Sequence, residues 1–372
     1  MTPFGITGPG RILFGRGEAA KAPALIAGFG TRGVVVHGAN PERAAWLIDA
    51  LGPDVLPMAC GQEPTLLLLE TAISEARRFG AQWVVALGGG AALDLGKAIA
   101  ALVPGAGGAM DHLEVVGRGL PLTAVPLPYI AIPTTAGTGA EATKNAVIGV
   151  PEHRRKVSLR DDRMLARIAI VDPALTDHCP RRVTLASGLD ALTQVIEPYV
   201  CTRANPFTDA LTRPAVSMGL TALRRLMDGE DAAARDRLAW VSLCGGLALA
   251  NAGLGAVHGL AGVIGGMTPA AHGAICGVLL GPVLQMNLQN GGERVAEVCA
   301  ILGAGLGVAA DRAPSALSLW AKEAGLPGLM AQGLRPQDHR MVAEAALVSS
   351  SMKGNPGVPT VDALINALEQ AG

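Results

Sequence analysis

Short hydrophobic runs alternate with amphipathic segments in the first half of the chain. The runs are rich in Val and Ile, are bounded by Gly and Pro, and fall at residues 33–37, 83–87, 129–132 and 168–171. Segments 41–51 and 65–79, which lie between them, are candidate helices. Uninterrupted β-branched runs separated by helices indicate strands that are buried on both faces, and hence a parallel sheet.

Beyond residue 173 the β-branched runs disappear, and long Ala- and Leu-rich stretches follow, for example at 215–227 and 235–252. Ala and Leu have high helix propensities, so this half should be almost entirely helical. A chain of 372 residues is long for one core and sufficient for two. We therefore expect an α/β domain with a parallel, Rossmann-like sheet over residues 1–175 and an all-α domain over residues 176–372.

The composition limits the partners that we expect. A net charge of −1 leaves no basic field for a polyanion, so nucleic acid and anionic membranes are not expected as partners. Half of the residues are hydrophobic, which suggests large buried areas, including the interface of a homodimer or higher homo-oligomer. The six cysteines stand singly, and the chain has neither a signal-peptide pattern nor a run of ~20 apolar residues. These features predict a cytoplasmic protein with reduced thiols.

Two glycine patterns resemble dinucleotide-binding turns, but one of them has the wrong context. The segment GFGTRG at 28–33 has the pattern GxGxxG, yet it precedes the hydrophobic run 33–37 instead of following a strand. We expect a helix end and a turn there. The glycine triplet 88–90 follows the run 83–87 and opens a helical segment, an arrangement that turns backbone N–H groups and a helix dipole toward a phosphate.

A second polar loop, PTTAGTGAE at 133–141, follows the run 129–132. It contains three threonines and two glycines. It also follows a predicted parallel strand, and open α/β sheets bind ligands at the carboxyl ends of their strands. We therefore expect the 88–90 and 133–141 loops to contribute to one ligand-binding crevice.

Candidate metal ligands lie in the second half. Asp190 and Gln194 are four residues apart in a helical segment, so they share a face. His258 and His272 are flanked by small residues, and Gly and Pro residues at 265–269 interrupt the chain between them, so both imidazoles can turn toward one centre. Taken singly, an Asp at a helix start is usually a cap and a His among apolar residues is usually part of the core. Spacing alone therefore leaves the metal site open.

Four segments carry a resemblance to a known family. GGGAALDLGKAIA is similar to a GGGSxxDxxK segment, IPTTAGTGAEAT to a PTTAGTGSE loop, GLDALTQVIEPYV to GxDALTHAIExYV, and LGAVHGLAGVIGGMTPAAHG to LGxVHGxAHxxGxxxxxPHG. These are motifs of the iron-containing (group III) alcohol dehydrogenases, and the similarity covers nearly the whole chain. The resemblance implies a dehydroquinate synthase-like architecture, in which the α/β domain binds a nicotinamide dinucleotide and the helical domain binds metal and substrate.

The resemblance also implies contacts to the cofactor. In that family the two loops hold the pyrophosphate and the nicotinamide, and nearby Asp and Lys positions match as well. The implied contacts are Gly88, Gly89, Gly90, Asp94, Thr134, Thr135, Thr138 and Lys156. Gly38 stands where members that favour NAD(H) often carry Asp, which permits NADP(H); of its neighbours, Arg43 could pair with a 2′-phosphate and Glu42 would oppose it. We expect either NADP(H) or NAD(H).

A divalent metal, Fe²⁺ or Zn²⁺, is implied in the same way. The family ligands carried over by position are Asp190, Gln194, His258 and His272, and Asp190, His258 and His272 form the implied catalytic group. Gln194 replaces a family histidine, and its neutral carbonyl oxygen is a weaker ligand for iron or zinc, so the metal affinity should be lower. Gly262 replaces a histidine that often relays a proton in this family.

The activity implied is that of an oxidoreductase. It would interconvert a primary or small alcohol and its aldehyde or ketone by hydride transfer with NAD(P)(H), while the metal acts as a Lewis acid on the substrate oxygen. Three alternatives stay open. They are a metal-independent enzyme similar to maleylacetate reductase, which would need Arg160 or Arg203 to bind a dicarboxylate, a lyase of the dehydroquinate synthase type, and a catalytically inactive family member.

Overall fold

The computed structural model describes residues 3–289 and 292–372, which form two compact units. One unit, here called the sheet unit, comprises Thr7–Thr135 and Ala140–Thr176. The other, the helical unit, comprises residues 3–6, Ala136–Gly139 and the described part of Asp177–Gly372.

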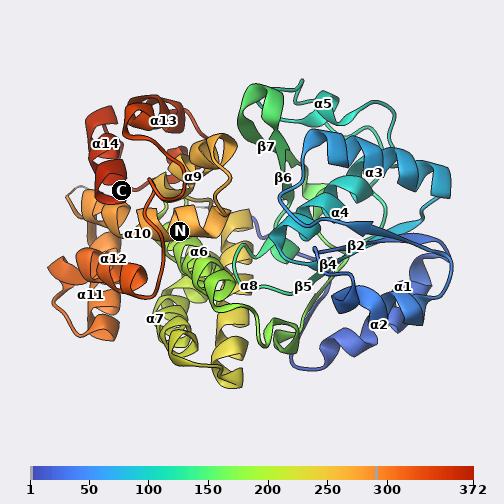
Figure 1. The fold of residues 1–372 in the computed structure, drawn as a ribbon, viewed down its shortest axis with the longest axis horizontal. Helices are drawn as coiled ribbons and strands as arrows, with labels where there is room; N and C mark the ends of the chain where they lie inside the picture. The colour runs from blue at the N-terminus through green and yellow to red at the C-terminus, as the bar shows by residue number, and fades with distance from the viewer. Residues whose placement is uncertain (1–2, 290–291) are drawn as a thin grey trace. The chain divides into compact units, whose positions relative to one another are not determined.

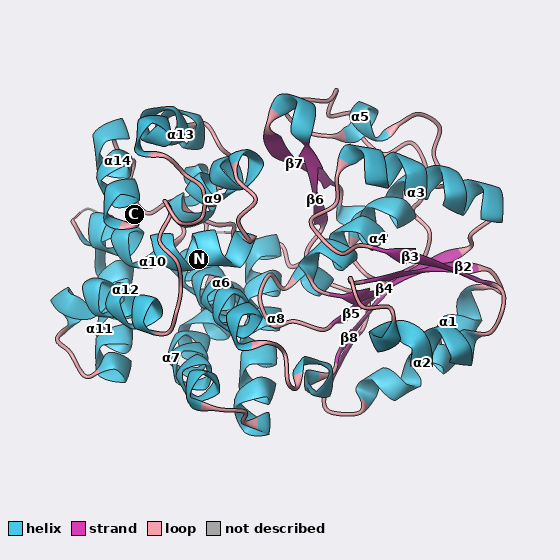
Figure 2. Ribbon diagram, in the orientation of Figure 1, coloured by secondary structure: helices cyan, strands magenta, loops and turns pink. Residues whose placement is uncertain are grey.

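The sheet unit is built on a six-stranded sheet with the strand order β1-β8-β5-β4-β2-β3 (Figure 2). Its strands are β1 (Ile12–Phe14), β2 (Gly33–His37), β3 (Val55–Ala59), β4 (Trp83–Gly88), β5 (Tyr129–Pro133) and β8 (Ile168–Val171). Each neighbouring pair is parallel, which confirms the predicted fold class. A separate antiparallel hairpin is formed by β6 (Asn145–Val150) and β7 (Arg155–Arg160).

Helices cover both faces of this sheet (Figure 1). The helices of the sheet unit are α1 (Ala22–Ile26), α2 (Glu42–Leu51), α3 (Leu66–Phe79), α4 (Gly90–Leu102) and the short α5 (Ala109–His112). Successive residues of a strand point to opposite faces. Val34 and Val36 accordingly belong to the core beneath α3 and α4, whereas Val35 belongs to the core beneath α1 and α2. Strands β2, β4, β5 and β8 are buried along their whole length, as their uninterrupted apolar runs predict.

The four predicted strands and the two predicted helices of this half lie within one residue of their expected bounds. The segment 28–33 also behaves as predicted. It contains the end of a short 3₁₀ helix, and Gly30 then turns the chain with φ = 129° just before β2. Strands β1, β3, β6 and β7 lie outside the predicted elements.

The helical unit contains no strand among its described residues, as predicted. Its helices are α6 (Arg181–Val200), α7 (Pro206–Asp228), α8 (Ala232–Asn251), α9 (Ala256–Met267), α10 (His272–Leu288), α11 (Gly292–Leu306), α12 (Ala313–Glu323), α13 (His339–Leu347) and α14 (Val361–Gln370). No single described helix is long and apolar enough to cross a membrane, and α8 and α9 meet that criterion only as a pair bent by 96°.

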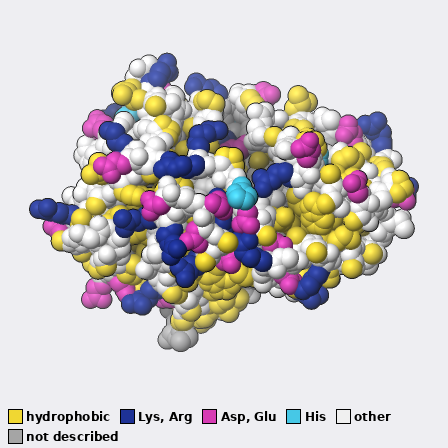
Figure 3. Space-filling model, turned by 60° about the horizontal axis from the view of Figure 1, so that its bottom comes forward, with side chains coloured by type: hydrophobic (Ala, Val, Ile, Leu, Met, Phe, Trp, Pro, Cys, Tyr) yellow, Lys and Arg dark blue, Asp and Glu magenta, His cyan; other side chains and the backbone are white. Residues whose placement is uncertain are grey.

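The surface and the thiols are in keeping with the composition. On the face drawn in Figure 3, Lys and Arg side chains are interspersed with Asp and Glu. All six cysteines are buried and free, as their scattered positions predict.

Candidate metal centre and cofactor loops

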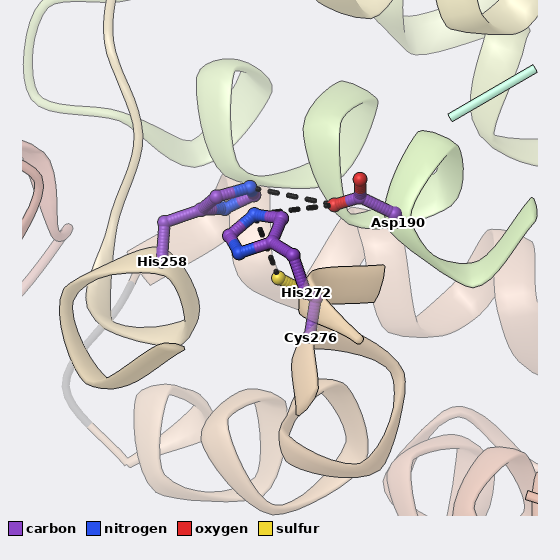
Figure 4. Close-up of side chains that lie close together, drawn as sticks. All are labelled: Asp190, His258, His272 and Cys276. Carbon is purple, nitrogen blue, oxygen red and sulfur yellow. Dashed lines mark hydrogen bonds and ion pairs between the residues drawn. The ribbon is translucent and has the colours of Figure 1, made fainter. Parts of the chain in front are cut away.

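Four side chains from three helices of the helical unit converge on one point (Figure 4). Asp190 lies on α6, His258 on α9, and His272 and Cys276 on α10. One ligand-type atom of each lies within 4.8 Å of the others. Asp190 Oδ1 is 3.5 Å from His258 Nε2 and 3.9 Å from His272 Nε2. The structure thus brings together the three residues that the sequence suggests as the catalytic group.

A glycine on α10 permits the close approach of this helix to α6. A Cβ atom at Gly273 would lie 2.5 Å from the carbonyl oxygen of Ala186, which is well inside van der Waals contact. A residue with a side chain could occupy this position only if the two helices moved apart. The close packing brings His272, the first residue of α10, next to Asp190.

Two buried atoms of the cluster lack a hydrogen-bond partner among the described residues. They are Asp190 Oδ1 and His258 Nε2. Asp190 is only 2% exposed and His258 only 7%. Leaving such atoms unpaired in the interior is costly unless a cation binds them. Carboxylate oxygens and imidazole nitrogens are also ordinary ligands of iron and zinc. The residues therefore fit a divalent metal ion.

The electrostatics of the cluster favour positive charge. Burial alone would lower the pKa of His272, but Cys276 and Asp190 outweigh it and raise this pKa to about 9. Burial would likewise lower the pKa of His258, yet its neighbours, among them Glu197, raise it well above the usual value. For Asp190, burial would raise the pKa, but the two histidines hold it below its ordinary range. The site therefore attracts a cation, either a proton or a metal ion.

Glu197 on α6 positions His258. Its Oε2 lies 2.6 Å from His258 Nδ1, and its Oε1 accepts a hydrogen bond from the backbone N–H of Val257 at 2.7 Å. A carboxylate at Nδ1 favours the tautomer in which Nδ1 carries the proton and donates it to the hydrogen bond. Nε2 then faces Asp190, and its lone pair can bind a metal once any proton on this nitrogen is displaced.

We expect Glu197→Gln to weaken the affinity for a divalent metal about 10–100-fold, because a neutral amide holds the imidazole less firmly and makes it less basic. Competition with a chelator measures the affinity. Glu344→Gln, on an exposed part of α13, is the matched control and should bind metal like the wild type. Equal affinities for the two variants would show that His258 does not depend on Glu197.

Gln194 lies one turn after Asp190 on α6 and is bonded to a loop of the same unit. Its Nε2 donates to the carbonyl oxygen of Thr138 and lies 3.4 Å from that of Gly137. The amide nitrogen thus connects α6 to the segment Ala136–Gly139. Ligation of a metal by Gln194 stays a prediction.

In the sheet unit, both predicted loops follow strands of the large sheet. Strand β4 ends at Gly88, Gly89 caps α4, and Gly90 is the first residue of that helix. Gly89 has no side chain that could form a hydrogen bond at this cap, and the first N–H groups of any α-helix lack partners within the helix. Thr134 N donates to Gly88 O at 2.9 Å, and a Cβ at Gly89 would lie 3.4 Å from Thr135 Oγ1, so the two loops are adjacent. Such a cradle of backbone donors is suited to an anion.

The other predicted cofactor contacts have partners or open space within the sheet unit. Asp94 accepts a hydrogen bond from the backbone of β6, and Lys156 on β7 pairs with Glu63. Apart from its chain neighbours, no heavy atom of the described residues lies within 4 Å of the place where Gly38 would carry a Cβ, so a ligand can approach closely there. Arg43 donates to a backbone carbonyl at 3.0 Å. The roles of these residues toward a cofactor stay predictions.

Glu141, in the second loop, should make stability depend on pH. It is 2% exposed, and burial raises its pKa from 4.5 to about 7, although Lys97 opposes the shift. The pKa of Glu141 is higher in the folded protein than in the unfolded chain. Protonated Glu141 therefore contributes fully to the stability of the fold below about pH 4.5, and this contribution is lost as the pH rises from there through 7.

We therefore expect Glu141→Gln, which stays neutral, to gain about 2 kcal/mol over the wild type between about pH 5 and pH 7. Denaturant unfolding of both proteins across this range measures the difference between their free energies of unfolding. Groups that titrate in the same way in both proteins do not contribute to this difference. Glu152→Gln, at an exposed position, should show no such trend. A constant difference at all pH values would mean that Glu141 titrates normally.

Cys276 and Glu197 lie outside the site suggested by the sequence. Cys276 follows His272 by four residues, and Glu197 follows Asp190 by seven, so each is on the same helix face as a predicted ligand. These spacings are the available signal for both residues. A cysteine on an apolar helix, however, usually belongs to the core.

Comparison with known proteins agrees with the motifs. Residues 9–173 match the family model "iron-containing alcohol dehydrogenase", and residues 184–372 match "Fe-containing alcohol dehydrogenase family, C-terminal". The chain is 31% identical to the NAD-dependent methanol dehydrogenase of Bacillus methanolicus over 100% of both chains. It is 38% identical to long-chain-alcohol dehydrogenase 1 of Geobacillus thermodenitrificans over 73% of this chain and 67% of that one.

The fold agrees as well. A solved alcohol dehydrogenase from Oenococcus oeni superimposes with a TM-score of 0.90 and 27% identity over 100% of both chains. A solved 1,3-propanediol oxidoreductase superimposes with a TM-score of 0.89 and 26% identity, again over 100% of both. The two family models together match most of the chain, one relative is similar over its full length, and the fold is shared. The chain therefore belongs to the iron-containing alcohol dehydrogenase family.

Proposed function

We propose that this protein is an NAD(P)-dependent alcohol dehydrogenase or aldehyde reductase (EC 1.1.1) that interconverts a primary or small alcohol and its aldehyde or ketone. The observation that carries the proposal is the cluster of buried Asp190, buried His258 and half-buried His272, in which two ligand atoms lack hydrogen-bond partners among the described residues. The names of the relatives, a methanol dehydrogenase and a long-chain-alcohol dehydrogenase, support the same reaction class.

The helical unit would hold Fe²⁺ or Zn²⁺. Asp190, His258 and His272 are the proposed ligands and the proposed catalytic group, and Gln194 is the predicted further ligand. A divalent cation bound there supplies a Lewis acid for the substrate oxygen. Glu197 keeps the Nε2 lone pair of His258 directed into the cluster. The low exposure of Asp190 and His258 limits competition from water and strengthens the electrostatic contacts inside the site.

The sheet unit would hold NADP(H) or NAD(H), which supplies or accepts the hydride. The backbone N–H groups at the start of α4 would bind the pyrophosphate, and the threonine hydroxyls of the second loop would donate further hydrogen bonds. The proposed contacts in the sheet unit are Gly38, Gly88, Gly89, Gly90, Asp94, Thr134, Thr135 and Lys156. Thr138, which belongs to the helical unit, is proposed as a further contact. In this proposal residues 1–175 form the dinucleotide-binding domain, and residues 176–372 form the metal- and substrate-binding domain.

The substrate and the setting follow from broader features. The relatives are named for alcohols as different as methanol and long-chain alcohols, so we propose a small-molecule alcohol or aldehyde as the substrate class. Six buried, free cysteines suit a reducing compartment, and we propose a cytoplasmic enzyme. The high content of hydrophobic residues suits a homodimer or higher homo-oligomer.

The test is an assay of NADH and NADPH oxidation by purified protein against short and long aldehydes, before and after chelation. Turnover should be lost on chelation and should return when Fe²⁺ or Zn²⁺ is added back. Turnover that survives complete removal of metal would reject the Lewis-acid chemistry and favour the alternative similar to maleylacetate reductase. Maleylacetate itself is therefore one arm of the panel. Arg160, one of the two candidate cations for this alternative, is paired with Glu114 at 3.2 Å.

A further inference from the structure

Cys276 is the unassigned member of the metal cluster. It lies on α10, one helical turn after His272, and its Sγ is within 4.8 Å of ligand atoms of Asp190, His258 and His272 (Figure 4). We propose that Cys276 binds the metal as a thiolate, so that Asp190, His258, His272 and Cys276 form a four-ligand centre that favours Zn²⁺. This inference rests on the proposed function, because it assumes that the cluster holds a metal.

The distances within the cluster match those between ligands of one ion. Zinc binds nitrogen, oxygen and sulfur at about 2.0–2.3 Å, so the ligand atoms of a tetrahedral site lie about 3.3–3.8 Å apart. The separation between Cys276 Sγ and His272 Nε2 is 3.5 Å. The two Asp190 to histidine separations are 3.5 and 3.9 Å. Four ligand atoms have six distances between them, and three of these six are close to the values in a tetrahedral zinc site.

Unpaired atoms beside the thiol point to a ligand independently of the distances. Asp190 Oδ1 and His258 Nε2 are buried and have no hydrogen-bond partner among the described residues. A Cys276 that only filled the core would leave both atoms without a hydrogen bond, with only the 3.5 Å contact between them, at a cost in free energy. A cation bound by all four side chains satisfies them together. Cys276 itself is completely buried, which protects a thiolate from water and oxidants.

Gln194 stands where the family has a histidine, so the metal would lack one strong ligand that Cys276 could supply. The amide nitrogen of Gln194 donates to the carbonyl of Thr138, so this end of the side chain is committed to the loop Ala136–Gly139. An amide oxygen is a weak ligand toward zinc, whereas a thiolate is a strong and soft one. Cys276 would therefore restore the affinity that the substitution at 194 removes. A centre containing a thiolate selects Zn²⁺ over Fe²⁺.

Metal binding would displace at least one proton and would involve no change in oxidation state. The Cys276 thiol releases its proton to solvent as the S–metal bond forms, and any proton held by the histidines leaves in the same way. Metal uptake is therefore coupled to proton release. With four side chains holding the ion, its Lewis acidity would still be available to the substrate oxygen, because zinc sites sometimes expand to five ligands.

The first test requires no variant. The full-length protein, stripped of metal and loaded with Co²⁺, should show a near-ultraviolet sulfur-to-cobalt charge-transfer band in addition to the visible d–d bands. Zinc analysis of the untreated protein should give one ion per chain. Bound cobalt without the charge-transfer band would overturn the role of Cys276 and leave the metal site of the proposed function intact. A protein that binds neither ion would overturn both proposals.

The second test uses substitutions. Cys276→Ser should weaken zinc binding at least about 100-fold in chelator competition, because removing a ligand costs no less than removing a group that orients one. Cys299→Ser, which changes a completely buried cysteine on α11, is the matched control and should bind zinc normally. Adding Gln194→His to Cys276→Ser should restore binding, because the imidazole supplies the missing ligand. Wild-type affinity in Cys276→Ser would contradict the inference.

Discussion

Changing Asp190 to Asn is expected to release the metal and to lower kcat/KM for the alcohol substrate by about a thousand-fold. The amide keeps the volume of the side chain but removes the charge that faces His258 at 3.5 Å and His272 at 3.9 Å. A neutral amide is a weak ligand, and its NH₂ group cannot bind a cation at all. A Lewis acid contributes several kcal/mol to the transition state, and each 1.4 kcal/mol corresponds to a factor of about ten in rate.

Elemental analysis and steady-state kinetics on the same preparation check this expectation. Asp362→Asn, at a side chain that is 84% exposed, is the control and should keep both metal and activity. The thermal midpoint of each variant shows whether the protein has stayed folded. An Asp190→Asn protein that keeps a full complement of metal and more than about a tenth of the activity would remove Asp190 from the catalytic group.

The sequence predicts the strands that are buried on both faces and misses those at the edges. Strands β2, β4, β5 and β8 lie inside the sheet, where nearly every residue is buried and apolar, and the resulting runs are easy to recognise in the sequence. Strand β3 is at the edge and contains Pro57, whose missing N–H is tolerated there and which interrupts the apolar run. Strand β6 alternates buried and half-buried residues, because one of its faces is only partly covered.

The candidate site is predictable from sequence only in part, for a different reason. The motifs around Asp190, His258 and His272 identify those residues. A motif, however, compares each position of the sequence only with the same position in the family, so it cannot reveal a ligand at a position where the family has none. The substitution at Gln194 weakens the expected ligand set, and a compensating ligand can come from any residue that the fold brings near. Cys276 belongs to another helix, so its relation to Asp190 follows only from the packing of α10 against α6. A three-dimensional structure was needed to connect them.

A second large effect is expected behind the loop at 133–141, where Lys97 of α4 is 1% exposed. Its ammonium group donates to three acceptors at 2.8, 2.9 and 2.8 Å, namely Ala140 O, Thr143 Oγ1 and Asn145 O. Lys97 therefore connects α4 to the loop and to β6. We expect Lys97→Met to destabilise the protein by on the order of 3 kcal/mol, because methionine fills the space but leaves buried acceptors without donors.

Thermal and denaturant unfolding measure this loss, which corresponds to a fall of roughly 10 °C in the midpoint. Lys21→Met, at a lysine whose side chain is 58% exposed, is the control and should change the stability little.

The loss of stability in Lys97→Met should also grow with pH. Burial lowers the pKa of Lys97 from 10.5 to about 8, against the opposing charges of Asp94 and Glu141. The unfolded chain therefore binds more protons between these values, so the wild type gains stability as the pH rises from 8 to 10, whereas methionine does not titrate. A loss below about 1 kcal/mol at pH 7 would mean that the three acceptors do not depend on Lys97. A loss that shrank from pH 8 to pH 10 would mean that the pKa of Lys97 is raised in the folded protein, not lowered.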